Sequence, residues 1–254
     1  MGRGDAFVRR GQPERAIAEY RQAIAAKPTY VVARQVLAAL LHEQGRDDDA
    51  IREYRALLEL TPADADAYNS LGQVYTARGL TGDAEAAYRT AVRLRPDFAE
   101  AHVNWGNALA QQRRLDHAVE EYRAALRIDP GFADAHYNLG IAWAAQGAVD
   151  EAIAAYRAAL AARPDYAAAH INLGLLLASH SQLDAAITEY RQVQATNANF
   201  FEAQCNLASA LAAKGQLDEA IAALKNALAI RPDSVPAQQA LQAFERQRGK
   251  GTAP

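Results

Sequence analysis

Prolines recur at a fixed interval along this chain, and that interval limits how it can fold more than any other feature. The spacing is 34 residues or a multiple of it, with Ala198 in the one missing place: Pro28, Pro62, Pro96, Pro130, Pro164 and Pro232. A period of roughly 20 to 50 residues is typical of arrays in which each repeat buries its apolar face against its neighbours. We therefore expect stacked units rather than one core built from distant segments.

The repeats can be counted from the third residue after each proline. Residues 1–30 form a partial repeat that supplies the end of a first helix and all of a second. Residues 235–247 are predicted to form a capping helix, and residues 248–254 a disordered tail. The six full repeats span residues 31–64, 65–98, 99–132, 133–166, 167–200 and 201–234.

Each repeat contains the pattern of two amphipathic helices. Apolar residues recur three and four apart, as at Ile153, Tyr156 and Leu160. A glycine such as Gly147 separates the helices, where a left-handed residue can end the first of them. The proline ends the second helix, and β-branched residues are too scattered for strands. The pattern predicts helix, turn, helix, turn.

Two repeats lack one or more of these stop signals. Arg113 and Ser181 stand where the turn glycine is expected, and Ala198 replaces the proline. Because repeat 167–200 lacks two stop signals, we expect its joint near residues 197–200 to be looser or locally re-packed.

Small and aromatic residues also recur once per repeat. Small residues are expected where paired helices approach closely, and a tyrosine four residues after the second helix's alanine is expected to fill the seam to the next repeat. The glycines are Gly72, Gly106, Gly140 and Gly174; the alanines are Ala50, Ala84, Ala118, Ala152, Ala186 and Ala220; the tyrosines are Tyr20, Tyr54, Tyr88, Tyr122, Tyr156 and Tyr190.

These positions carry a family resemblance over residues 4–234. The pattern resembles the tetratricopeptide consensus, here in Asn138, Leu139, Gly140, Trp143, Ala152, Tyr156, Ala159 and Pro164. The resemblance implies an all-α, right-handed α-solenoid of stacked helix-turn-helix hairpins, with first helices lining a concave groove and second helices forming the convex back. It also implies a non-catalytic scaffold for protein–protein interaction.

Composition narrows the classes of partner. The chain has 27 Lys and Arg against 30 Asp and Glu, a formal charge of -3, which gives no basic surface for nucleic acid. No apolar run is long enough to cross a membrane, and the N-terminus has no secretory apolar region. The single cysteine, Cys205, cannot form an intramolecular disulfide. We expect a cytoplasmic protein that binds neither nucleic acid nor membrane.

A ladder of amides marks the predicted groove. It consists of Asn104, Asn138, Asn172 and Asn206, one repeat apart on the first helices. A primary amide carries both donors and an acceptor, so it can pair with the backbone of an extended peptide whatever that peptide's side chains are. The ladder is similar to that of the tetratricopeptide superhelix in O-GlcNAc transferases. The alternative is that the amides only link neighbouring repeats, and both interpretations stay open.

Other polar residues are predicted to surround the ladder. One rim carries the acids Asp66, Glu100, Asp134 and Glu202, and the remaining candidates are Asn69, Gln73, Asn107 and Tyr137. Ala110, Ala144, Ala178 and Ala212 are expected to keep the floor of the groove open. The carboxylate-clamp cations of related chaperone-binding repeats are absent here. We therefore expect a protein or extended-peptide partner that is neutral or basic.

Catalytic and metal sites are not expected. His102, His136 and His170 share the repeat period, but stacked helices lie about 8–10 Å apart and Zn–N bonds need about 2 Å. We expect these histidines to pack between helices in place of the usual aromatic residue. Cys205 has no histidine on its stripe to act as a base. The predicted protein is not an enzyme and uses no cofactor or small-molecule substrate.

Two other functions are alternatives to a scaffold for protein–protein interaction. One is a substrate-recruiting arm of a glycosyltransferase-like protein or complex, which a nucleotide-sugar domain encoded downstream would indicate. The other is single-stranded RNA reading, which the acidic rim and the few aromatic residues oppose.

Overall fold

The computed structural model describes residues 2–194 and 196–251, apart from the side chains of residues 250 and 251. That part contains fifteen α-helices and no strand, so the all-α class of stacked helical hairpins is confirmed. Contacts divide the chain into two compact units, Met1–Pro130 and Gly131–Pro254, each of which is considered by itself.

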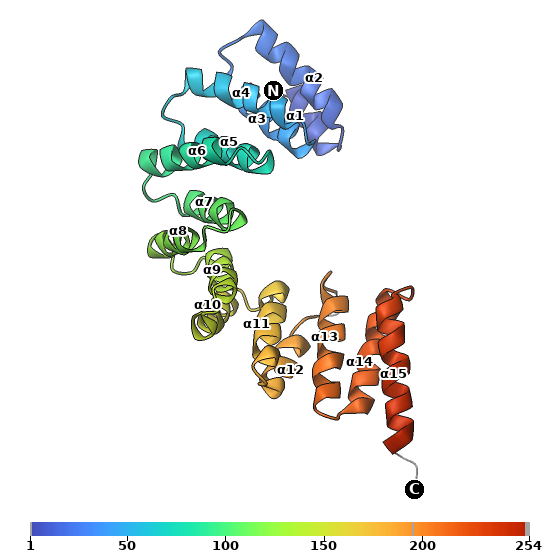
Figure 1. The fold of residues 1–254 in the computed structure, drawn as a ribbon. Coiled ribbons are helices and arrows are strands. Elements are labelled where there is room, and N and C mark those ends of the chain that lie inside the picture. Colours follow the sequence, from blue (N-terminus) through green and yellow to red (C-terminus); the bar gives the residue numbers. More distant parts are fainter. Residues whose placement is uncertain (1, 195, 252–254) are drawn as a thin grey trace. The chain divides into compact units, whose positions relative to one another are not determined.

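In both units, helices pair into hairpins and each hairpin packs on the next (Figure 1). The first unit contains α1 (Gly2–Arg9), α2 (Pro13–Ala26), α3 (Val31–Glu43), α4 (Asp47–Leu60), α5 (Ala65–Ala77), α6 (Thr81–Leu94), α7 (Ala99–Gln111) and α8 (Leu115–Ile128). The second contains α9 (Ala133–Ala145), α10 (Val149–Ala162), α11 (Ala167–Ser179), α12 (Leu183–Arg191), α13 (Phe200–Ala213), α14 (Leu217–Ile230) and α15 (Val235–Gly251).

A tyrosine ring seated on a glycine holds each of several hairpins together. A Cβ atom at Gly106 would lie 2.5 Å from the ring of Tyr122, and one at Gly174 would lie 2.5 Å from the ring of Tyr190. Both tyrosines are fully buried. Any side chain at these glycines would push the paired helices apart.

The tyrosine rings are predicted to fill the seam to the next repeat, and the structure shows a further contact that the sequence did not indicate. The ring packs inside its own hairpin because only glycine leaves room for it there. The hydroxyl groups differ in what they face. That of Tyr122 donates a hydrogen bond to Asn107 in its own hairpin, whereas those of Tyr54 and Tyr156 lie near Ser70 and Asn172 of the next repeat.

The joint of repeat 167–200 differs from the others, as its missing stop signals indicate. Helix α12 has 9 residues, whereas α10 and α14 have 14. The change begins upstream of residues 197–200, because α12 already ends at Arg191. Asn197 Oδ1 accepts a 2.9 Å hydrogen bond from the backbone N–H of Asn199, a local bond that competes with helix.

Helix α15 extends past its predicted end. It runs to Gly251, so the prediction of a tail from residue 248 is wrong for residues 248–251, while residues 252–254 lie outside the described part. A 3.1 Å ion pair between Arg248 and Asp218 connects this last turn to α14. Leu241 and Phe244 pack on the apolar cluster of the second unit, as a cap requires.

The turn residues Arg113 and Ser181 should be points of stored strain. They adopt φ of 63° and 61°, the left-handed conformation that the turn glycines use. This costs a non-glycine residue about 1–2 kcal/mol, partly offset by the greater unfolded-state freedom of glycine. Arg113→Gly and Ser181→Gly should each raise the melting temperature, whereas Gly147→Ala, at φ 78°, should lower it. Melting temperatures that do not change in these variants would show that the left-handed residues store no strain.

Removing residues 235–254 should expose the apolar face of α14 that α15 covers. We expect a lower melting temperature or self-association, measured by thermal denaturation and light scattering. Removal of residues 249–254 alone is the control, since it keeps Arg248 and the packed side chains. A truncated chain that melts like the intact one and stays monomeric would show that α15 is not a cap.

Candidate functional site

The predicted ladder lies on the first helix of each repeat. Asn104 belongs to α7, Asn138 to α9, Asn172 to α11 and Asn206 to α13, and all four side chains are half-buried. Their neighbours differ from repeat to repeat.

In the first unit, the amides join helices to one another. Asn104 Nδ2 donates a 3.1 Å hydrogen bond to Asn69 Oδ1, which connects α7 to α5. Asn107 Oδ1 accepts a 2.8 Å hydrogen bond from the Tyr122 hydroxyl, which connects α7 to α8. Gln73 is exposed. The structure therefore brings Asn69 and Asn104 together and turns Asn107 toward its own hairpin.

In the second unit, the ladder meets a cluster of tyrosines. Asn172 Nδ2 donates a 3.1 Å hydrogen bond to the hydroxyl of Tyr137. The Tyr137 ring lies 6.0 Å from the ring of Tyr156 and 4.8 Å from that of Tyr166. Burial raises the pKa of Tyr137, and it raises the pKa of Tyr156 to about 12. Both hydroxyls therefore stay protonated at neutral pH.

A sequence separation of 35 residues explains which ladder asparagines have a hydrogen-bond partner on the preceding repeat. The partners Asn69 and Tyr137 each precede their ladder asparagine by 35 positions. Counting back 35 from Asn206 reaches Ile171, which has no polar group. Accordingly, Asn206 Nδ2 is buried and without a hydrogen-bond partner in the described residues. An unsatisfied buried donor costs about 1–3 kcal/mol.

The acids of the predicted rim are partly neutralised. Asp66 forms an ion pair with Arg95, and Asp134 forms bonds of 3.1 and 3.0 Å with Arg163. Hydrogen bonding from Arg163 lowers the pKa of Asp134. Glu100 is exposed and forms no ion pair within the described residues. The signal that sequence reasoning missed is an arginine 29 residues after each paired acid.

Two of the periodic histidines, His102 and His170, lie between paired helices, as expected, and both form polar links there. His102 Nδ1 lies 2.6 Å from Glu121 Oε2. His170 Nδ1 lies 2.8 Å from Glu189 Oε2, and its Nε2 lies 2.9 Å from the carbonyl oxygen of Pro164. Within residues 2–194 and 196–251, no three His, Cys, Asp or Glu side chains gather as they would around a metal ion.

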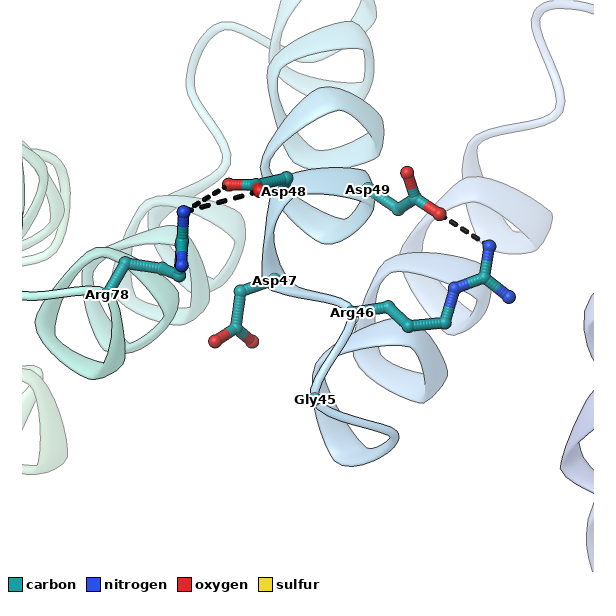
Figure 2. Close-up of a pocket in the computed structure, with 6 residues that line it drawn as sticks. All are labelled: Gly45, Arg46, Asp47, Asp48, Asp49 and Arg78. Carbon is teal, nitrogen blue, oxygen red and sulfur yellow. Dashed lines mark hydrogen bonds and ion pairs between the residues drawn. The ribbon is translucent and has the colours of Figure 1, made fainter.

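A charged depression of about 260 Å³ opens at the turn between α3 and α4. Arg78 pairs with Asp48 at 3.0 Å, and Arg46 pairs with Asp49 at 2.5 Å (Figure 2). Cations pair in the same way with acids 30 residues earlier in Lys214–Asp184 and Arg248–Asp218. The depression is therefore one of several ion-paired links between repeats. Its lining consists of Gly45, Arg46, Asp47, Asp48, Asp49 and Arg78.

A second pocket lies on the ladder face of the second unit. It measures about 390 Å³ and is lined by Ile141, Ala144, Tyr156, Asn172, Leu175, Leu176 and Ser179. Ile141 and Leu175 are 40% and 43% exposed, so both present apolar surface to solvent at the pocket. Sequence analysis identified Asn172 and the open floor at Ala144, but not the pocket between them.

Comparison with known proteins places this helical-repeat fold in a family. Models described as tetratricopeptide repeat or TPR repeat match residues 4–45, 38–79, 69–133, 103–167, 150–200 and 171–235. The chain belongs to the tetratricopeptide repeat family. No curated protein matches it in sequence.

Solved structures resemble the chain in fold. A crystal structure of MamA is 27% identical, with a TM-score of 0.59 over 63% of this chain and 94% of that one. Pseudomonas aeruginosa pilF is 19% identical, with a TM-score of 0.69 over 85% of this chain and 97% of that one. The C-terminal part of a TPR repeat-containing protein from Cytophaga hutchinsonii is 17% identical, with a TM-score of 0.71 over 94% and 98%.

His170 should make stability depend on pH. Burial by itself would lower the pKa of His170, but its bonds to Glu189 and Pro164 outweigh burial and raise that pKa above 6.5. The raised pKa contributes stability that is fully present below about pH 6.5 and is lost as pH rises through the folded-state value.

We therefore expect the melting temperature to fall as the pH rises above about 6.5, and His170→Gln to remove part of that fall. Glutamine is a suitable replacement because Gln238 donates a 2.6 Å hydrogen bond to the Pro232 carbonyl at the equivalent place. His117→Gln, at an exposed position, is the control. An identical pH profile in the His170 variant would contradict the assignment.

Proposed function

We propose that this chain binds an extended segment of a partner protein along the first-helix faces of its repeats. Tetratricopeptide repeat proteins generally act as non-catalytic scaffolds for protein–protein interaction, so protein partners follow from the family. The observation that supports the peptide-binding face is the row of half-buried amides on successive first helices.

The amides have hydrogen-bonding capacity to spare. A primary amide has two N–H donors and an oxygen that can accept two bonds. In Asn104, the one bond found uses a single donor, to Asn69. In Asn172, one Nδ2 donor goes to the Tyr137 hydroxyl. Linking repeats and contacting a peptide backbone are therefore compatible roles for one side chain.

The repeat spacing suits an extended chain. First helices one repeat apart are separated by roughly 10 Å, and each extended residue spans about 3.3 Å. Successive amides would then meet about every third residue of the partner. The agreement in spacing concerns only the main chain of the partner. Selection among the partner's side chains would have to come from other parts of the first-helix face.

The charge preference of the face depends on few residues. Since Asp66 and Asp134 are paired with arginines of their own repeats, Glu100 and Glu202 are the exposed acids that remain at the rim. Exposed pairs contribute under about 1 kcal/mol each. We propose a neutral or mildly basic partner segment held mainly by hydrogen bonds and apolar contact.

Replacing Asn138 and Asn172 together by Ala should weaken binding of a peptide selected against the intact chain. The expected loss is about 1 kcal/mol for each hydrogen bond removed. Stability should fall as well, because the bond from Asn172 to Tyr137 links α11 to α9. Affinity by calorimetry and the melting temperature are measured on the same samples.

Asn206→Ala separates binding from stability. Asn206 has a buried unpartnered donor, so its removal should leave the melting temperature unchanged or raise it. If the ladder contacts the peptide, this variant should nevertheless bind more weakly. Full affinity in both the Asn206 variant and the double variant, measured below their melts, would make the asparagines structural residues only.

A further inference from the structure

The pocket beside Asn172 differs from the rest of the ladder face in its apolar walls. Ile141 on α9 and Leu175 on α11 occupy the same place in neighbouring repeats. The equivalent residues in the other full repeats are Ala39, Gln73, Asn107 and Ser209, none of which is both large and apolar. Ile141 and Leu175 are therefore two large, exposed apolar side chains in a row of otherwise small or polar residues.

None of the residues that line this pocket is charged. Its polar residues are Tyr156, Asn172 and Ser179, all of which are uncharged at neutral pH. A charged side chain that entered would lose its hydration without gaining a partner, which is unfavourable. An apolar side chain would instead cover Ile141 and Leu175 and remove their surface from water.

Size and position also favour a side chain as the occupant. A volume of about 390 Å³ lies at the small end of the range for ligand pockets, roughly 300–1,000 Å³. Ala144 lines the pocket, where a larger residue would occupy the space. Since Asn172 lines it too, a peptide whose backbone bonds to that amide would have a neighbouring side chain within reach.

We infer that this pocket is the anchor of the binding face and accepts one large apolar side chain, such as leucine, methionine or phenylalanine, from an extended partner segment. The inference rests on the proposed function, because it needs a peptide on the first-helix face. The pocket would give the face a preference for one kind of partner side chain. The amide ladder does not provide this preference, because it would bond only to the main chain of the partner.

The test is a selection from a displayed library of random dodecapeptides against the intact chain, followed by synthesis of the selected peptides. We expect them to share a large apolar residue at one position, and its replacement by Ala to weaken binding by about tenfold to a hundredfold. Ile141→Gln combined with Leu175→Gln should cause a similar loss. Both residues are already 40% or more exposed, so this variant should melt like the parent.

Two further comparisons make the test specific. The double variant should no longer distinguish the apolar peptide from its Ala version, because the contact would already be lost. The matched control is Ile230→Gln, which changes a 48% exposed apolar residue at the end of α14, and it should bind normally.

The outcomes separate the anchor from the proposed function. Peptides that lose affinity with Asn138→Ala and Asn172→Ala, yet bind the glutamine variant fully, would overturn the anchor and leave the peptide-binding face standing. Peptides insensitive to both sets of changes, or a library that yields no binders, would count against the proposed function and the anchor together.

Discussion

The contact between a glycine and a tyrosine inside five of the hairpins is the constraint on which the other features depend. At Gly106 and Gly174, the absence of a Cβ atom lets the partner ring lie directly on the helix backbone. That approach sets the separation of the paired helices and buries the ring. The hydroxyl group of Tyr122 then forms a hydrogen bond with Asn107 within the same hairpin. One close contact thereby organises the hairpin.

Hydrogen bonds between side chains of successive first helices bear on both interpretations of the asparagine ladder. The bonds from Asn104 to Asn69 and from Asn172 to Tyr137 stabilise the stacking of repeats, which favours the structural interpretation of the ladder. The unpartnered Nδ2 of Asn206 does not fit that interpretation, since it contributes no such link. The structural role and the proposed binding role therefore overlap at Asn104 and Asn172 and separate at Asn206, which is why Asn206 is informative.

Charge is used in this chain mainly to connect elements. Arg95 and Arg163 neutralise rim acids, Arg78 ties its turn to Asp48, and His170 joins α11 to Glu189. Most of these pairs are partly exposed and contribute little individually. The ladder face of the second unit keeps one uncharged, apolar depression between Ile141 and Leu175. Under the proposed function, shape and apolar contact would therefore select a partner more than charge would.

The amino-acid sequence by itself determined the helical hairpins, their period and the ladder positions, because local helix signals repeat every 34 residues. It also indicated the altered joint of repeat 167–200 from two missing stop signals. Tertiary structure alone decided that tyrosine rings pack within hairpins, that Asp66 and Asp134 are neutralised and that α15 continues to Gly251. Each of these depends on which side chains meet across helices. Periodicity assigns a residue to a face of its helix, but the partner it meets depends on the packing between helices.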